Sequence, residues 1–254
     1  MPTMRITWGV AARSLRLIPR LPSTFVPSLI MPVVFVVVFS GAFAGLTALP
    51  AFPTREMVDW FIPVAALMGC GFAGITTGMG VARDLEIGFY DRFLVSPAPR
   101  RALLGGAILA AVLRGLLPLA LVLAVGALYG ASVPGGVLGI LSLIAAGLGL
   151  AACAGAWSVG IGLRFKTQQS APLMQVGMFL GMFLSTLQMP LELLTGWLHT
   201  VATWNPITQV IDLARQGFVG NVGWETTWPG LAAVAGIFAV LIVFAARGMR
   251  AVVR

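Results

Sequence analysis

Residues 137–163 read VLGILSLIAAGLGLAACAGAWSVGIGL, a run of 27 residues without a charged side chain. As an α-helix this run would be about 40 Å long, whereas the hydrocarbon core of a bilayer is about 30 Å thick. A helix bonds its own backbone groups internally, and hydrocarbon offers them no other partner. The run therefore predicts a membrane-spanning helix and decides the class of the fold.

Hydropathy predicts five more spans around this run, at residues 25–46, 60–81, 103–129, 172–190 and 228–246. The mean hydropathy is +0.98 and only 9% of the residues are charged, against roughly 25% in soluble domains. We therefore expect an all-α integral membrane protein with six transmembrane helices. Residues 1–254 form a single transmembrane domain, because no stretch outside the spans resembles a soluble domain.

The distribution of basic residues between the spans predicts the orientation. Thirteen basic residues fall in one set of compartments: Arg5, Arg13, Arg16, Arg20, Arg83, Arg92, Arg100, Arg101, Arg164, Lys166, Arg247, Arg250 and Arg254. The other set holds only Arg55 and Arg215, together with several acids. Cytoplasmic loops carry the excess of basic residues, so both termini are expected in the cytoplasm. The same rule explains the net charge of +8 without a nucleic-acid partner.

Few side chains suited to chemistry are present. Cys70 and Cys153 both lie in apolar runs, which argues against a structural disulfide or a metal site. His199 is the only histidine, and no paired nucleophiles occur at mid-membrane depth. We expect no catalytic residues, no metal and no cofactor in this chain.

Residues 3–20 predict an amphipathic helix, because Arg5, Arg13 and Arg16 share one narrow stripe among apolar residues. Such a helix lies in the membrane interface with its arginines toward lipid phosphates. The alternative is a basic leader that only sets the topology.

The loop after the second span reads RDLEIGFYDRFLVSPAPR at residues 83–100. Over 84–96 a helix would gather Leu85, Phe89 and Phe93 on one apolar face, and Pro97 would end it. An ordinary cytoplasmic loop explains the arginines here, but not an apolar face outside the bilayer. We interpret the segment as a short helix that contacts a protein partner or the lipid interface.

Residues 191–220 are apolar but too interrupted for one span, and Asn205-Pro206 divides them. We expect a re-entrant pair of short helices on the outer side, which is permissible where backbone is buried in protein.

Together these features resemble the permease subunits of type-2 ATP-binding-cassette exporters, close to the daunorubicin-resistance-like permeases. In the first cytoplasmic loop the family pattern is matched by Glu86, Gly88, Arg92, Ser96 and Pro97. Before the last span it is matched by Asn205, Pro206, Arg215 and Gly220. The resemblance covers nearly the whole chain.

The resemblance implies a permease without its own motor, in the plasma membrane of a bacterium, exporting drugs or lipid-like amphiphiles as in antibiotic resistance. The sequence agrees, since no Walker A motif is present; its nearest approach has Phe165 at the second required glycine. ATP and Mg would bind a separate nucleotide-binding subunit, and a second copy or homologue of the permease would complete a dimer. Contact with that subunit is implied for Glu86, Gly88, Phe89, Asp91, Arg92 and Pro97.

The resemblance also implies that the second and fifth spans line the substrate pathway. The residues so implied are Met68, Phe72, Thr76, Gln175, Met178, Phe179 and Met182. Methionine and aromatic side chains form adaptable walls for varied amphiphiles, although a lipid-facing or packing position explains each single residue at least as well. Arg114, within the third span, either reaches the cytoplasmic interface, pairs within the dimer or contacts an anionic substrate.

The alternative function is an ATP-independent secondary transporter or channel. That class calls for buried mid-membrane acids or inverted repeats, and the sequence contains no such acid and no convincing repeat.

Overall fold

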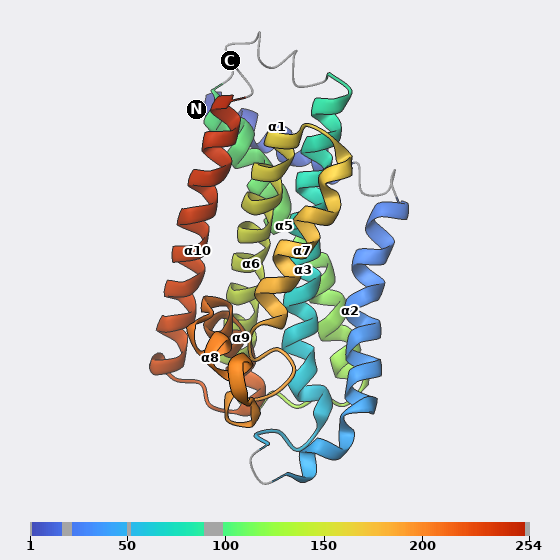
Figure 1. Cartoon of the computed structure of the whole chain (residues 1–254). Helices are drawn as coiled ribbons and strands as arrows, with labels where there is room; N and C mark the ends of the chain where they lie inside the picture. The colour runs from blue at the N-terminus through green and yellow to red at the C-terminus, as the bar shows by residue number, and fades with distance from the viewer. Residues whose placement is uncertain (1, 17–21, 50–51, 89–98, 252–254) are drawn as a thin grey trace.

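A computed structural model of the chain describes residues 2–16, 22–49, 52–88 and 99–251, and within these ranges every regular element is a helix. The long helices stand side by side in one bundle, with α1 and the end of α10 at the same end (Figure 1). The elements are α1 (Pro2–Arg16), α2 (Pro22–Ala42), η2 (Ala44–Ala48), α3 (Met57–Glu86), α5 (Arg100–Leu128), α6 (Gly136–Phe165), η3 (Gln168–Ser170), α7 (Ala171–Phe183), η4 (Leu191–Leu193), α8 (Gly196–Trp204), α9 (Pro206–Val219) and α10 (Trp224–Ala251).

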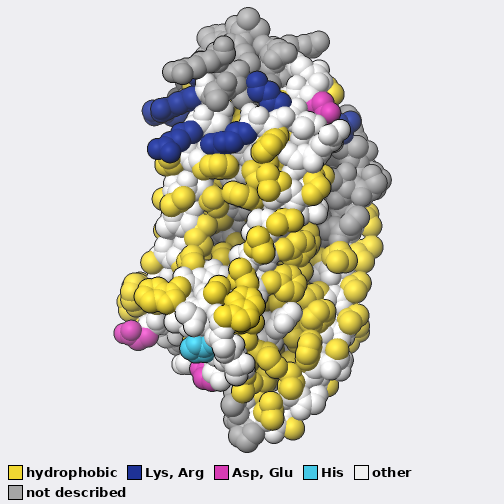
Figure 2. Space-filling view, in the orientation of Figure 1, with side chains coloured by type: hydrophobic (Ala, Val, Ile, Leu, Met, Phe, Trp, Pro, Cys, Tyr) yellow, Lys and Arg dark blue, Asp and Glu magenta, His cyan; other side chains and the backbone are white. Residues whose placement is uncertain are grey.

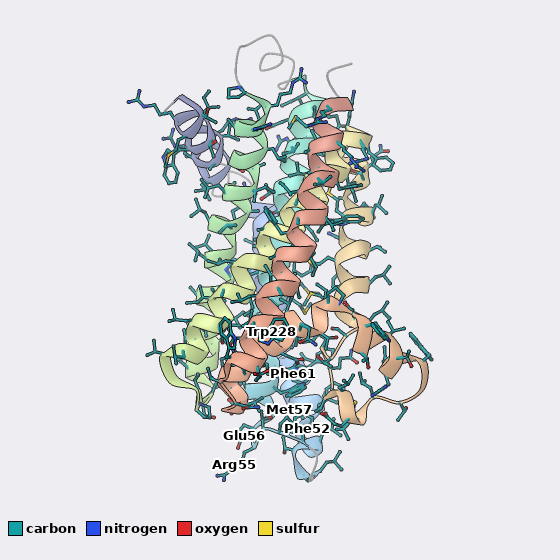
Figure 3. The ribbon with its side chains drawn as sticks, turned by 90° about the vertical axis from the view of Figure 1, so that its left-hand side faces the viewer. Phe52, Arg55, Glu56, Met57, Phe61 and Trp228 are labelled. Atoms are coloured by element: carbon teal, nitrogen blue, oxygen red, sulfur yellow. The ribbon has the colours of Figure 1, made fainter. Side chains whose placement is uncertain are left out.

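Charge divides the bundle into two ends. The basic end holds Arg83, Arg100, Arg101, Arg164, Lys166, Arg247 and Arg250, and the acidic end holds Glu56, Asp59, Glu192, Asp212 and Glu225. Figure 2 shows basic side chains gathered at one end, with a largely apolar flank between the two ends. Arg55 and Glu56 lie at the extreme of the acidic end (Figure 3).

Four helices among the described residues are long and apolar enough to cross a bilayer, namely α3, α5, α6 and α10. In α2 the apolar stretch found among those residues is shorter, from Leu29 to Ala42. The span predicted at 172–190 is wrong in its end, because α7 stops at Phe183 after 13 residues. A helix of that length covers only about 20 Å.

Helix α3 is the centre of the bundle and packs against α2, α5, α6, α7 and α9. Every residue from Met57 to Gly71 is buried. Farther along, α3 and α6 approach closely: a Cβ on Gly74 would lie 2.6 Å from the backbone nitrogen of Gly155. The Ser158 hydroxyl donates a hydrogen bond to the Gly74 carbonyl across this contact (2.9 Å). The small residues thus lock α3 to α6, as such residues do in membrane helix pairs.

Helix α1 packs along the beginning of α5 instead of standing apart from the bundle. Val10 fills the space over Gly106, where a Cβ would lie 2.6 Å from the Val10 Cβ. The expected helix at 3–20 is observed at Pro2–Arg16, and residues 17–20 lie outside the described residues. One face of α1 is therefore covered by protein.

Candidate functional site

The last turn of α3 carries the first sequence-predicted contact residue, Glu86. Its carboxylate accepts hydrogen bonds from the Gln168 backbone N–H (3.3 Å), the Gln168 side-chain amide (3.2 Å) and the Thr167 hydroxyl (3.5 Å). These bonds tie the end of α3 to the connection between α6 and α7 at the basic end. Glu86 itself is solvent-exposed, so it remains within reach of a partner protein.

A separate helix was predicted at 84–96, and the described part of this segment instead forms the end of α3. Residues 84–86 belong to α3, and Ile87 and Gly88 form the turn that ends it, with Gly88 at φ 70°. This left-handed backbone favours glycine, which gives a physical reason for Gly88. The other predicted contact residues, Phe89, Asp91, Arg92 and Pro97, lie outside the described residues.

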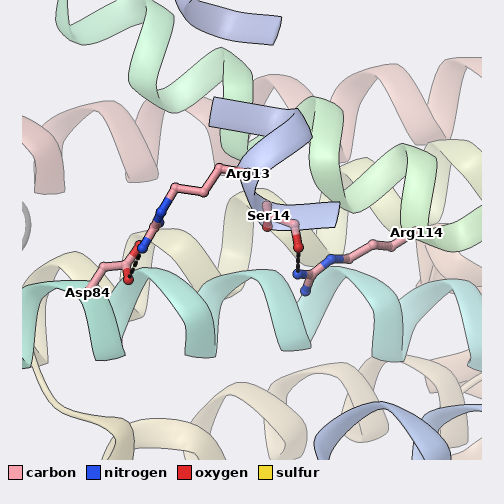
Figure 4. A network of polar contacts seen from close by, with 4 residues as sticks. All are labelled: Arg13, Ser14, Asp84 and Arg114. Atoms are coloured by element: carbon pink, nitrogen blue, oxygen red, sulfur yellow. Dashed lines mark hydrogen bonds and ion pairs between the residues drawn. The ribbon is translucent and has the colours of Figure 1, made fainter. Parts of the chain in front are cut away.

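A second acid in the same turn, Asp84, ties α3 to α1. Arg13 of α1 binds the Asp84 carboxylate with both guanidinium nitrogens, one of them at 3.0 Å (Figure 4). Arg13 was expected to face lipid phosphates and points to protein instead. Sequence reasoning missed the role of Asp84; its only signal was an acid inside a strongly basic compartment.

Arg114 of α5 completes this network from the third helix. The side chain is buried, and its Nη2 donates a hydrogen bond to the Ser14 carbonyl (Figure 4). Ser14 lies in the last turn of α1, where carbonyls lack a partner within the helix and the helix dipole is negative. Arg114 therefore caps the C-terminus of α1, a role that none of the three sequence-based alternatives named.

The predicted pathway residues separate into two groups. Met68, Met178 and Met182 are buried, and the thioether of Met178 packs against Gly71 between α3 and α7. The other four are partly exposed: Phe72, Thr76, Gln175 and Phe179. The structure brings Phe72 and Phe179 together in an edge-to-face contact at 5.7 Å.

At the acidic end, Asn205 joins two helices through one side chain. Its Oδ1 accepts from the Ile207 backbone N–H (3.0 Å) and so caps the N-terminus of α9, which begins at Pro206. Its Nδ2 donates to the carbonyls of Gly181 (2.7 Å) and Leu184 (2.8 Å) at the end of α7. Helix termini leave such groups without a partner. The Asn-Pro pair therefore starts α9 and ends α7 at one point.

Arg215 of α9 fixes the chain that follows α7. Its guanidinium donates to the carbonyls of Thr186 and Leu187, both at 3.1 Å, and stacks 3.4 Å above the ring of Trp60. The Trp60 indole N–H in turn donates to the Gln188 carbonyl (3.1 Å). Arg215 is buried. The backbone carbonyls of residues 186–188 thus have Arg215 and Trp60 as their hydrogen-bond donors.

The match to known proteins covers most of these features. Residues 53–247, well over half of the chain, match the sequence profile of the ABC-2 family transporter proteins. The chain belongs to this family. The match begins just before α3 and includes the Glu86, Asn205 and Arg215 networks.

Two relatives indicate the kind of transporter. The daunorubicin resistance ABC transporter permease protein DrrB1 of Streptomyces coeruleorubidus is 25% identical over 232 residues, which are 90% of this chain and 80% of DrrB1. The probable multidrug ABC transporter permease YbhR of Escherichia coli K12 is 28% identical over 193 residues, which are 69% of this chain and about half (49%) of YbhR. The ABC-2 permease is therefore a multi-pass membrane transport subunit, and the predicted family is confirmed.

Proposed function

We propose that this permease is the transmembrane subunit of an ATP-driven exporter that moves drugs or lipid-like amphiphiles out of a bacterial cytoplasm. ATP and Mg bind a separate nucleotide-binding subunit, and two permeases enclose the pathway. The observation that carries the proposal is α3, a continuous 30-residue helix buried along most of its length. It reaches from the basic end to the Trp60–Arg215 stack, and the ABC-2 relatives named for drug resistance support the substrate class.

The proposed topology has six spans with the basic end in the cytoplasm. Helices α3, α5, α6 and α10 cross the bilayer, α2 is a further span, and α7 completes its crossing together with the helices α8 and α9 that re-enter from outside. Exposed tryptophans at the acidic end support this arrangement: Trp197, Trp204, Trp224 and Trp228. Tryptophan is enriched where membrane meets water.

Energy enters this exporter at residues 84–97, the loop that follows α3. Glu86 holds the end of α3 to the Thr167–Gln168 segment, so a partner that moves the loop also moves the start of α7. Phe89, Asp91, Arg92 and Pro97 are proposed to contact the nucleotide-binding subunit, and Gly88 to allow the turn between them and α3.

Substrate moves along the partly exposed faces of α3 and α7. Helix α3 is buried from Met57 to Gly71, yet Phe72 and Thr76 farther along are partly exposed. Gln175 and Phe179 of α7 are partly exposed as well. The buried methionines Met68, Met178 and Met182 lie behind this surface and give it compliance, because thioether side chains repack readily.

The test is export of daunorubicin by vesicles that contain the permease and its nucleotide-binding partner. We expect transport that requires ATP and Mg, and no ATP hydrolysis by the permease alone. Transport by the permease alone, driven by an ion gradient, would refute the proposal.

A further inference from the structure

A cavity of about 410 Å³ lies at the acidic end beside the buried Arg215. It is formed by the segment before α3, by α3 and α9, by the connection between α7 and η4, and by the start of α10. Its volume falls in the range of small-molecule pockets, roughly 300–1,000 Å³. Pro53, Pro190, Leu191 and Val219 give it apolar walls.

Two carboxylates line this cavity, Asp212 from α9 and Glu192 from η4. Among the described residues no cation forms an ion pair with either of them. Arg215 lies near Asp212, but both of its terminal nitrogens donate to the carbonyls of Thr186 and Leu187. The cavity therefore holds two carboxylates and one guanidinium, and the terminal nitrogens of that guanidinium already donate to backbone carbonyls.

The charges of Asp212 and Glu192 are close enough to interact. Two carboxylates close enough to repel each other favour a cation between them.

Thr186 provides a second, independent observation. It is only 3% exposed and lines the cavity, yet its hydroxyl oxygen forms no hydrogen bond of standard geometry with any described residue. Buried polar atoms normally have a partner. The hydroxyl lies near the Asp212 carboxylate but outside hydrogen-bond geometry. Three oxygen-bearing side chains, Thr186, Asp212 and Glu192, therefore line the same cavity.

We infer that this cavity binds an organic ammonium ion, with Asp212, Glu192 and Thr186 accepting from its N–H groups and the apolar walls covering its hydrocarbon body. A protonated primary amine has three donors for these three acceptors. A bare calcium ion fits less well, because it takes six to eight oxygen ligands and the described residues contain no group of three acids, histidines or cysteines placed to hold a metal. Amine binding itself does not depend on the proposed function. Only the role of the cavity in export, as an outward site for cationic amphiphiles, rests on it.

The experiment measures saturable binding of radiolabelled 2-phenylethylamine to the full-length permease in lipid nanodiscs, without ATP, against empty nanodiscs. Unlabelled 2-phenylethanol, which replaces the ammonium with a hydroxyl, and calcium chloride serve as competitors. The variants are Asp212→Asn, Glu192→Gln and Thr186→Val. The matched control is Glu225→Gln, an exposed acid at the same end that does not line the cavity.

We expect Asp212→Asn and Glu192→Gln each to weaken amine binding at least tenfold, Thr186→Val to weaken it severalfold, and Glu225→Gln to leave it unchanged. The alcohol should compete at least tenfold less well than unlabelled amine. Equal competition by the alcohol, displacement by calcium at equal concentration, or unchanged binding in the acid variants overturns the inference. Glu192 is exposed, so Glu192→Gln still reports if Asp212→Asn fails to fold.

These outcomes are separate from the test of export. If the permease binds the amine through Asp212 but exports nothing, the proposed amine site stands and the proposed export function is refuted. If the permease exports with ATP but does not bind the amine, the export function stands and the amine site is refuted.

Discussion

Replacing Asn205 with alanine should destabilise the acidic end by about 3 kcal/mol, because one side chain supplies three hydrogen bonds there. Loss of the N-cap of α9 costs about 1 kcal/mol. The two bonds to the Gly181 and Leu184 carbonyls contribute about 1 kcal/mol each, and more if the carbonyls stay buried without a donor. Asn205 is partly buried, so the total should be close to this sum.

Two further substitutions separate these contributions. Asn205→Ser keeps an oxygen that caps α9 but is too short to reach α7, so it should lose about 2 kcal/mol. Asn205→Asp also keeps the cap but places a charge against the carbonyls of Gly181 and Leu184, so it should be at least as harmful as Asn205→Ser. The order of stability is therefore wild type, serine, and then alanine.

The assay is equilibrium unfolding in mixed micelles with increasing dodecyl sulfate, followed by circular dichroism. His199→Ala is the control, since His199 is exposed on the neighbouring helix α8. If Asn205→Ala unfolds with the wild-type midpoint, or if Asn205→Ser is no more stable than Asn205→Ala, the double-cap account is wrong.

Three further predictions address the basic end and the orientation. Glu86→Ala should reduce export far more than ATP hydrolysis in reconstituted vesicles, since it frees α3 from the loop before α7; equal losses of both would contradict this. Arg114→Leu should change overall stability by no more than about 2 kcal/mol, because losing the cap costs about 1.5–3 kcal/mol while removing the charge saves an insertion cost of about 2.5–3.5 kcal/mol. A spin label on α1 should nevertheless gain mobility, and unchanged spectra would contradict the capping role. In a background without native cysteines, a cysteine at Arg55 should react with an impermeant thiol reagent from outside and one at Lys166 only after permeabilisation; outside labelling at Lys166 would reverse the topology.

The longest helices could be predicted from the sequence because hydropathy is a local property. The spans expected at 60–81, 137–163 and 228–246 lie within the observed helices α3, α6 and α10, and the one expected at 103–129 exceeds α5 by a single residue. The family was also predictable, since its motifs are short and occur in a fixed order along the chain.

The end of α7 could not be predicted in the same way. Residues 184–190 read LSTLQMP and carry no charge, so hydropathy over a span-length window continues the helix. What ends it is the Asn205 amide, 21 residues beyond Leu184, which takes the terminal carbonyls. A contact between distant segments therefore overrides the local pattern.

The role of α1 shows the same limit. The stripe of arginines was visible in the sequence, but a stripe does not say whether it faces lipid or protein. Arg13 binds Asp84, which is 71 residues away in the sequence, and the Ser14 carbonyl accepts a hydrogen bond from Arg114, 100 residues away. Sequence alone offered no means to choose these partners among the other charged residues.

The two ends of α3 are anchored by different chemistry, and this has a consequence for transport. At the basic end Asp84 and Glu86 hold α1 and the Thr167–Gln168 segment through exposed or partly exposed bonds. At the acidic end Asp59 accepts from the backbone and hydroxyl of Ser132, and Trp60 supports Arg215. From residue 60 to residue 84 the helix rises about 36 Å, locked to α6 on the way. Because a helix is stiff along its axis and the solvent-exposed bonds are the weaker ones, a displacement of residues 84–86 breaks contacts at the basic end first and reaches the Trp60–Arg215 stack with little loss. The proposed exporter would thus open its outer cavity by moving α3 together with α6, to which it is locked.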